Sequence, residues 1–524
     1  MVTGTETHGD SSLPCAASGP GFLDQLEAAA KRTLHSAGPR YSPALDPSAP
    51  NLDVQPLLDA TAVLTLGEVF RLRLADLQLA VRQTYDKHEH LLDRLFQRRT
   101  VDMQRVAADL ADLERASGPA AIRQGALTLR RHLGLVERKI GAALDSDYDD
   151  LDILNRETSL GNEEEHQSST QRQERLRRRI ADLRRCLDPV SEIGDLVNGD
   201  IGSLLTDKGA ILLLGEWGTG KTHFLCDLAM RTLSEGCPAV IVLAADLRPD
   251  LAPLDAIADA TGIAASGTGL VHKLNQAAAA LGQRALLIVD AINEADRDQW
   301  RRRLPQLLRD VGPVEHVGFI VSCRTPFDRS MIAGGARKSM LELRHPGFED
   351  QEFDAQLEFF RHYGLPALEV PLLTDEFSRP LFLKLMCEGV KGLKRRSQRQ
   401  KLREIASGQK SMTYVLEQFV KRAGQEVETK HHLAAKTCWS VMKGDPRNGR
   451  AGFAGVLAFN RREWLFRSEA VAEVQTLTNV PEQTAGSVVT DMVTSGLLVE
   501  QPRYLDGDYV DAFCCFRISG SPIT

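Results

Sequence analysis

An octapeptide at residues 215–222, GEWGTGKT, carries the residue types that hold a nucleotide phosphate. Its glycines let the backbone curl so that successive N–H groups point inward at an anion. Lys221 is placed to reach the β- and γ-phosphates, and the Thr222 hydroxyl suits Mg²⁺. The spacing predicts a loop that binds ATP or ADP with Mg²⁺. Its nucleotide-binding set is Gly215, Gly218, Thr219, Gly220, Lys221, Thr222 and His223.

A second chemical signal is the apolar run Leu286-Leu287-Ile288-Val289, which ends in Asp290. A carboxylate at the carboxyl end of a buried strand lies where open α/β sheets bind ligands, so Asp290 is a candidate to hold Mg²⁺. Asn293 and Glu294 follow closely. Arg324 ends another apolar run; by spacing alone it serves equally well as a γ-phosphate contact or as a surface salt-bridge residue.

Apolar runs at 210–214, 239–244, 285–289 and 317–322 alternate with helical stretches. This alternation predicts an α/β P-loop NTPase fold, a parallel sheet flanked by helices with right-handed crossovers. A chance glycine-rich turn is the alternative for the loop. The apolar strand before it and the helical pattern after it argue against that alternative.

The region before the nucleotide domain is predicted to be helical. Residues 1–20 are polar and predicted disordered, and a helix is expected over 22–36. Apolar residues then recur every three or four positions from 64 to 144, which predicts a helical bundle or coiled-coil hairpin. His88 lies on this stripe, and a core or edge position is favoured over a ligand role because no other ligand lies at a matching spacing.

Residues 146–188 are interpreted as an acidic linker followed by an arginine-rich helix. A solvated helix, or one neutralised by the adjacent acidic linker, is favoured there over nucleic-acid binding. The same weighing applies to the basic stretch 391–403, where a solvated face is favoured over contact with a polyanion.

The C-terminal region is predicted to hold a helical lid and a winged helix. Amphipathic helices are expected at 348–363 and 381–390, and a further helix at 412–441. Helices at 468–477 and 481–495, then strands at 497–503 and 509–518 joined at Leu505-Asp506-Gly507-Asp508, predict a winged helix. The predicted domains are 1–20, 21–145, 146–188, 189–346, 347–440 and 441–524.

Composition limits the function classes. The formal net charge is −7, so the whole chain offers no general attraction for nucleic acid. The 9 cysteines include no Cys-x-x-Cys pair, and so predict neither a zinc knuckle nor a disulfide framework. The N-terminus has no apolar signal core and no apolar run is long enough for a membrane span, which predicts a cytoplasmic protein without a membrane partner.

Four blocks, GEWGTGKT, LLIVDAINE, VSCRTPF and SRPLFLKLMC, resemble in order and spacing the STAND class of P-loop NTPases, which includes the NACHT and NB-ARC proteins of innate immunity. The similarity is most evident to the bacterial antiviral STAND ATPases, which favour the Asp-Ala-x-Asn-Glu and Pro-Leu-Phe-Leu-Lys-Leu blocks. The resemblance covers roughly residues 201–518.

This resemblance implies roles residue by residue. Asp290 is the Walker B carboxylate, Glu294 polarises the attacking water, and Arg324 is the sensor arginine. Pro380 lies where the class packs a Gly-x-Pro motif against adenine, with Ser378 replacing the glycine. Related ATPases place a catalytic glutamate where Ala291 stands, so hydrolysis is expected to be slow. The implied catalytic set is Glu294, Lys221, Asp290, Arg324 and Asn293; the implied metal ligands are Thr222 and Asp290.

The function expected from this resemblance is signalling. ADP holds the lid and winged helix closed, and ATP opens the chain so that copies form a homo-oligomer, in bacterial defence or stress signalling. No repeat of 20–50 residues is present, so a sensor or effector is expected on a partner protein, or the product is shortened. One alternative is an AAA+ initiator-like, DNA-associated ATPase; the helix at 481–495 has no Lys or Arg, which makes nucleic acid an unexpected partner. A nucleotide-locked scaffold is the other alternative.

Overall fold

The computed structural model describes most of the chain. The described residues are 20–37, 41, 54–96, 102–158, 163–264, 266–295, 297–325, 327–366, 375–391, 393–406, 420–421, 424–434, 436–444, 452–459, 465–494, 497–505 and 508–515. The segment predicted to be disordered, apart from its last residue, lies outside them. No helix within these ranges is long and apolar enough to cross a membrane.

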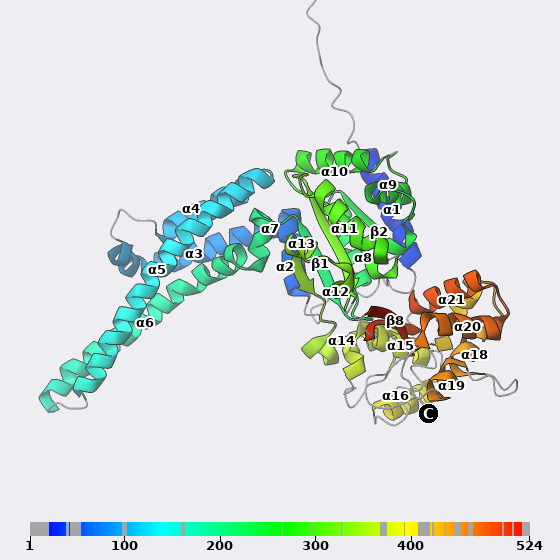
Figure 1. Ribbon diagram of the computed structural model, residues 1–524. Helices are drawn as coiled ribbons and strands as arrows, with labels where there is room; N and C mark the ends of the chain where they lie inside the picture. The colour runs from blue at the N-terminus through cyan, green and yellow to red at the C-terminus, as the bar shows by residue number, and fades with distance from the viewer. Residues whose placement is uncertain are drawn as a thin grey trace, which may run out of the picture.

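A five-stranded parallel sheet forms the centre of the molecule (Figure 1). Its spatial order is β2-β3-β4-β1-β5, so β4 lies between β1 and β3. The first four strands lie where the apolar runs predicted them, because strands covered on both faces need uninterrupted apolar sequence. β5 was not predicted, since it is short and alternates with charged residues at the sheet edge. The strands are β1 (Ala210–Gly215), β2 (Ala239–Leu243), β3 (Ala285–Asp290), β4 (Val317–Arg324) and β5 (Leu341–Arg344).

Helices cover both faces of this sheet, as a parallel sheet requires. Short 3-10 turns follow β2 and β3, and the one after β3 is Ile292–Glu294. The predicted α/β P-loop fold is therefore confirmed. The helices around the sheet are α7 (Ser203–Thr206), α8 (Lys221–Ser234), α9 (Pro253–Thr261), α10 (Gly267–Leu281), α11 (Arg297–Val311), α12 (Asp328–Met331) and α13 (Gly334–Lys338).

Helix α1 (Pro20–Ala37) forms where a helix was expected, but it packs on the nucleotide domain rather than on the N-terminal helices. The Thr33 hydroxyl donates to the Ile241 carbonyl at 2.9 Å, and Arg32 donates to the Thr261 carbonyl at 2.7 Å. The helix thus packs beside the edge strand β2. Helical periodicity shows which face is apolar, and does not show which surface that face will cover.

A long helical arm extends away from the sheet (Figure 1). The residues of the predicted apolar stripe form its interior, with Leu74, Val81 and Leu133 fully buried. His88 lies within α3 at a break in helical geometry, and its Nδ1 is 3.9 Å from an Asp182 carboxylate oxygen. The arm consists of α3 (Glu68–Phe96), α4 (Met103–Arg115), α5 (Pro119–Thr158) and α6 (Glu163–Asn198), whereas α2 (Gln55–Thr65) lies against the sheet.

The described residues of the acidic linker expected within 146–188 are helical. α5 continues through Thr158, and α6 continues past Pro189, where the nucleotide domain was predicted to begin. Charges that looked like those of a solvated linker meet across the hairpin: Arg179 Nε lies 3.1 Å from an Asp147 oxygen. The partners of a charged run come from a neighbouring helix, which composition alone does not reveal.

Buried residues between Phe348 and Leu498 build a second hydrophobic core, separate from that of the sheet. The predicted helix at 412–441 lies partly outside the described residues; the described part contains a turn at 431–434 before α18. The other predicted helices and the hairpin are present, and the pair Leu505 and Asp508 closes the hairpin. The helices here are α14 (Glu352–Tyr363), α15 (Pro380–Lys391), α16 (Arg395–Ala406), α18 (Thr437–Lys443), α19 (Gly452–Phe459), α20 (Arg467–Thr478) and α21 (Glu482–Thr494).

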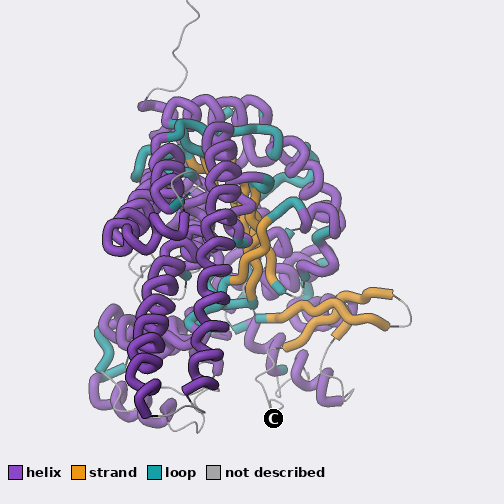
Figure 2. The backbone as a smooth tube through the Cα atoms, turned by 90° about the vertical axis from the view of Figure 1, so that its left-hand side faces the viewer, coloured by secondary structure: helices purple, strands orange, loops and turns teal. Residues whose placement is uncertain are grey.

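Three short antiparallel strands accompany these helices, in the order β6-β8-β7. Figure 2 shows them apart from the central parallel strands. They are β6 (Leu465–Phe466), β7 (Leu498–Leu505) and β8 (Asp508–Cys515).

Candidate functional site

The phosphate-binding loop connects β1 to α8. Gly218 and Gly220 have φ angles of 81° and 105°, in the left-handed region that favours glycine. The Thr219 hydroxyl donates to the Glu216 carbonyl at 3.0 Å and closes the loop. Gly220 is the N-cap of α8, so the first free N–H groups of that helix face the centre of the loop.

Lys221 is buried at the centre of the loop. Its ammonium donates to the carbonyl oxygens of Gly215 and Glu216, each at 2.7 Å. Burial, reinforced by the positive charge of Arg324, lowers the pKa of Lys221 to about 7. A phosphate at this position would supply the negative charge that a buried ammonium needs, so the geometry fits a nucleotide phosphate.

Asp290 and Thr222 lie together, as the sequence predicted. The Thr222 hydroxyl donates to one carboxylate oxygen of the buried Asp290 at 2.6 Å, and the Ser322 hydroxyl donates to the other. A hydroxyl and a carboxylate are the oxygen donors that Mg²⁺ prefers. No group of three or more His, Cys, Asp or Glu side chains in the described part of the chain could hold a metal. Mg²⁺ would therefore need phosphate and water as its remaining ligands.

Ala291 turns the chain immediately after Asp290. Its φ and ψ of 56° and 52° lie in the left-handed region, which is unfavourable for a residue with a Cβ atom. Its N–H donates to the Ser322 hydroxyl at 2.8 Å, which holds the turn against β4. Strained backbone of this kind concentrates at functional sites, because only a well-packed surrounding keeps it in place.

That turn brings Asn293 and Glu294 to Arg324 at the end of β4. The Arg324 backbone N–H donates to the Asn293 side-chain oxygen at 2.9 Å, and the Arg324 guanidinium forms an ion pair with the Glu294 carboxylate. Both partners of the pair are largely buried. The predicted base and the predicted sensor are therefore bound to each other. The order β3-β4-β1 makes this possible, because it places Arg324 between the loop and Asp290.

The start of α15 packs directly on the phosphate-binding loop. The Leu381 N–H donates to the Gly218 carbonyl at 3.2 Å, and the Arg379 guanidinium pairs with the Glu216 carboxylate. A Cβ on Gly218 would lie 3.2 Å from that of Leu381, so glycine permits this close approach. Trp217 contacts Phe382 of α15 edge to face, with ring centroids 5.6 Å apart.

Pro380 lies close to Gly220 at this contact: a Cβ on Gly220 would be 3.7 Å from the Pro380 ring. The structure thus places Pro380 against the loop, next to the predicted nucleotide-binding residues. His223, in the first turn of α8, faces the Tyr41 ring at a centroid distance of 5.2 Å. Tyr41 was not predicted from the sequence, because its neighbouring residues carry only the signal of a Pro-bounded turn.

His345 packs against the phosphate-binding loop, and it too was not predicted from the sequence. Its N–H donates to the Leu214 carbonyl at 2.8 Å, and its ring lies beneath Gly220. Burial and the nearby Lys221 lower the pKa of His345 to about 3, so its ring is neutral at physiological pH. The turn sequence His345-Pro346-Gly347 was a local signal, but the role of the ring depends on β5 pairing with β1.

No protein-family model matches the chain, and no curated protein matches it. Solved structures that resemble parts of it include Cdc6p from Pyrobaculum aerophilum (14% identity, TM-score 0.27, 58% of this chain and 83% of that one). A second is the Aeropyrum pernix ORC1 protein in complex with DNA (13% identity, TM-score 0.32, 62% of this chain and 87% of that one). A third is the replication initiator DnaA bound to AMPPCP and single-stranded DNA (12%, TM-score 0.25, 57% and 88%). Membership of the STAND class stays a prediction.

Proposed function

We propose that this chain is an ATP-dependent conformational switch that hydrolyses ATP slowly. The observation that carries the proposal is the double engagement of Glu216. Its carbonyl accepts from Lys221 at 2.7 Å, while its carboxylate pairs with Arg379 at the start of α15. Glu216 therefore connects the phosphate-binding loop, to which it belongs, with the helical lid.

Lys221 has two alternative partners in this proposal, the loop carbonyls or a phosphate. When its ammonium turns to the β- and γ-phosphates, it releases the carbonyls of Gly215 and Glu216. The loop then relaxes, and the lid contacts at Gly218 and Glu216 change with it. A ligand shifts a conformational equilibrium only through contacts that differ between the two states, and these contacts differ.

Arg324 offers the second half of the switch. It pairs with Glu294, and the same guanidinium can instead bind a γ-phosphate. The two partners compete, so ATP but not ADP would release Glu294 to polarise a water. Mg²⁺ held by Thr222 and Asp290 would neutralise phosphate charge. Ala291, and not a glutamate, directly follows Asp290, and Glu294 lies further along the chain. This arrangement supports slow turnover.

The output of the switch is proposed to be self-assembly. The segment from α19 to β8 has a helix, a short strand, two helices and a hairpin, an order that supports the predicted winged helix. α21 contains no Lys or Arg, so we propose that this module regulates the lid rather than reading DNA. A sensor or effector partner acting on the arm also belongs to this proposal.

The test combines particle size with local protection. We expect the full chain to be monomeric with ADP and to assemble with a non-hydrolysable ATP analogue, as measured by light scattering. Amide exchange within Pro380–Lys391 should differ between the two nucleotides. If nucleotide binds but neither exchange nor size changes, the switch is excluded. If exchange alone changes, assembly needs a partner, and cell extract added with the ATP analogue should restore it.

A second candidate is a DNA-associated ATPase of the initiator type, favoured by one observation, the arginine-rich face of α16. It differs from the first candidate in its output and shares its nucleotide site. Stimulation of ATP hydrolysis by DNA would support it.

A further inference from the structure

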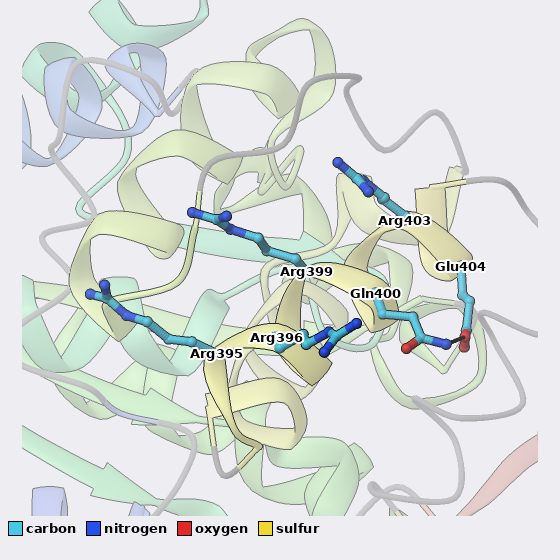
Figure 3. Close-up of a pocket in the computed structure, with 6 residues that line it drawn as sticks. All are labelled: Arg395, Arg396, Arg399, Gln400, Arg403 and Glu404. Carbon is cyan, nitrogen blue, oxygen red and sulfur yellow. Dashed lines mark hydrogen bonds between the residues drawn. The ribbon is translucent and has the colours of Figure 1, made fainter.

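Helix α16 presents a row of arginines to solvent beside a hollow of about 740 Å³ (Figure 3). Arg395, Arg399 and Arg403 recur every fourth residue, which places them about 6 Å apart along the helix axis. Arg396 stands next to this series, and all four side chains are exposed. The hollow is lined by Arg395, Arg396, Arg399, Gln400, Arg403 and Glu404.

The opposite face of α16 fixes the helix to the protein. Leu402 and Ile405 are each 1% exposed and belong to the second hydrophobic core. The Gln398 amide donates to the Lys391 carbonyl at the end of α15, at 3.2 Å. The arginines therefore project from an anchored helix with a defined orientation.

Within the described part of the chain, three of these arginines have no acidic partner. Arg395, Arg396 and Arg399 form no ion pair with any residue in the described ranges. The acidic residue of the helix, Glu404, accepts from Gln400 at 3.2 Å and lies 3.3 Å from Lys401. Like charges at four-residue spacing repel one another along a helix, so an anion on this face would stabilise it.

We propose that this face of α16 binds the phosphate backbone of duplex nucleic acid, without preference for sequence. A row of guanidinium groups at regular intervals fits a ligand whose negative charges also repeat at regular intervals. The groups are spread along the helix and do not converge on one point, as a site for a single small anion would require. The helix also offers no aromatic side chain on which unpaired bases could stack, so a single strand would gain no stacking energy over a duplex.

An acidic segment of a second copy is a poorer match. The acidic run at the end of α5 lies on the hairpin partner of the arginine-rich α6, and its Asp147 is already paired with Arg179. α21 is a poorer nucleic-acid surface as well, since it lacks cations and its Asp491 carboxylate pairs with Lys430 at 2.9 Å. This inference stands on α16 alone and does not depend on the nucleotide switch.

The experiment measures binding of the full chain to a fluorescent DNA duplex of arbitrary sequence, at several salt concentrations, without nucleotide. The test variant is Arg395→Gln/Arg396→Gln/Arg399→Gln. The matched control is Arg172→Gln/Arg175→Gln/Arg177→Gln, which removes three exposed arginines from α6. Glutamine keeps helix propensity, and loss of repulsion favours the helix, so the variant should fold.

We expect the wild type and the α6 control to bind alike, with affinity that falls steeply with salt. The α16 variant should lose at least about tenfold in affinity, and the slope of log affinity against log salt should shrink by about 3, near 0.9 for each phosphate lost. Equal losses in both variants, or no binding by the wild type at low salt, would overturn the proposal. So would polyglutamate competing as well as duplex, or a DNA-free change in particle size confined to the α16 variant, since both point to an acidic protein partner.

Discussion

The strand-tip site and the outer face of α16 use similar charged groups in opposite ways. At the strand tips, Lys221, Asp290, Glu294 and Arg324 are buried or nearly so and already bonded to protein groups. On α16 the arginines are exposed, and three of them form no ion pair with other described residues. A ligand at the first site must replace internal bonds, whereas a ligand on α16 replaces only water and counterions.

This difference predicts which ligand can change the conformation. When a ligand replaces an internal bond, the contacts within the protein change. Nucleotide binding can therefore be transmitted through Glu216 to the lid. Binding to α16 leaves the core contacts of Leu402 and Ile405 as they are. Substitutions at the strand-tip site test that contrast.

Lys221→Ala should abolish measurable ATP binding, a loss on the order of 10³-fold or more, because it removes the buried cation from the phosphate site. Calorimetry with ATP and Mg²⁺ measures the loss. Lys208→Ala, a half-exposed lysine just before β1, is the control and should bind normally. Unchanged affinity in Lys221→Ala would remove the phosphate assignment.

Glu294→Gln should leave ATP bound and slow its hydrolysis by on the order of 10²-fold, as loss of a positioned base does. Single-turnover hydrolysis measures the rate. Asn293→Ala is the companion variant, because its side chain holds the Arg324 backbone at 2.9 Å and should affect turnover less. If Glu294→Gln turns over normally and Asn293→Ala does not, the base has been misassigned.

Arg324→Ala should bind ADP as the wild type does and fail to assemble with the ATP analogue. Because the guanidinium would bind a γ-phosphate only in the ATP state, its removal should shift the populations by roughly a hundredfold. Light scattering with each nucleotide reads this out. The exposed Arg329→Ala is the control and should assemble normally. Normal assembly of Arg324→Ala would show that another group detects the γ-phosphate.

Lys221 should also make the nucleotide-free protein sensitive to pH. Its pKa is about 7 in the fold and 10.5 ordinarily, so the unfolded chain binds more protons between these values. Its contribution therefore becomes more favourable to folding as the pH rises from about 7 to 10.5. In thermal unfolding at pH 6.5 and 9, the melting temperature of Lys221→Met should exceed that of the wild type by more at pH 6.5 than at pH 9. An equal difference at both pH values would mean that Lys221 is not desolvated.

Sequence reasoning was most successful where the signal is local. The glycines of the loop, the strand ending in Asp290 and the hairpin at Leu505 each depend on neighbours within a few residues. The arginines of α16 were also evident in the sequence, but whether they have acidic partners was not. Whether Arg399 is neutralised depends on which acidic groups the fold brings near it, and the prediction of a merely solvated face could not include that.

Local sequence was enough to predict the P-loop, four of the five parallel strands and the helical nature of the flanking regions, because backbone conformation and periodic burial follow from adjacent side chains. Four contacts depend on the tertiary fold: α1 covers β2, Glu294 pairs with Arg324, His345 lies beneath Gly220, and Arg379 reaches Glu216. The last pair is separated by 163 positions along the chain. Contacts at such separations arise from strand order and core packing, which no local pattern encodes.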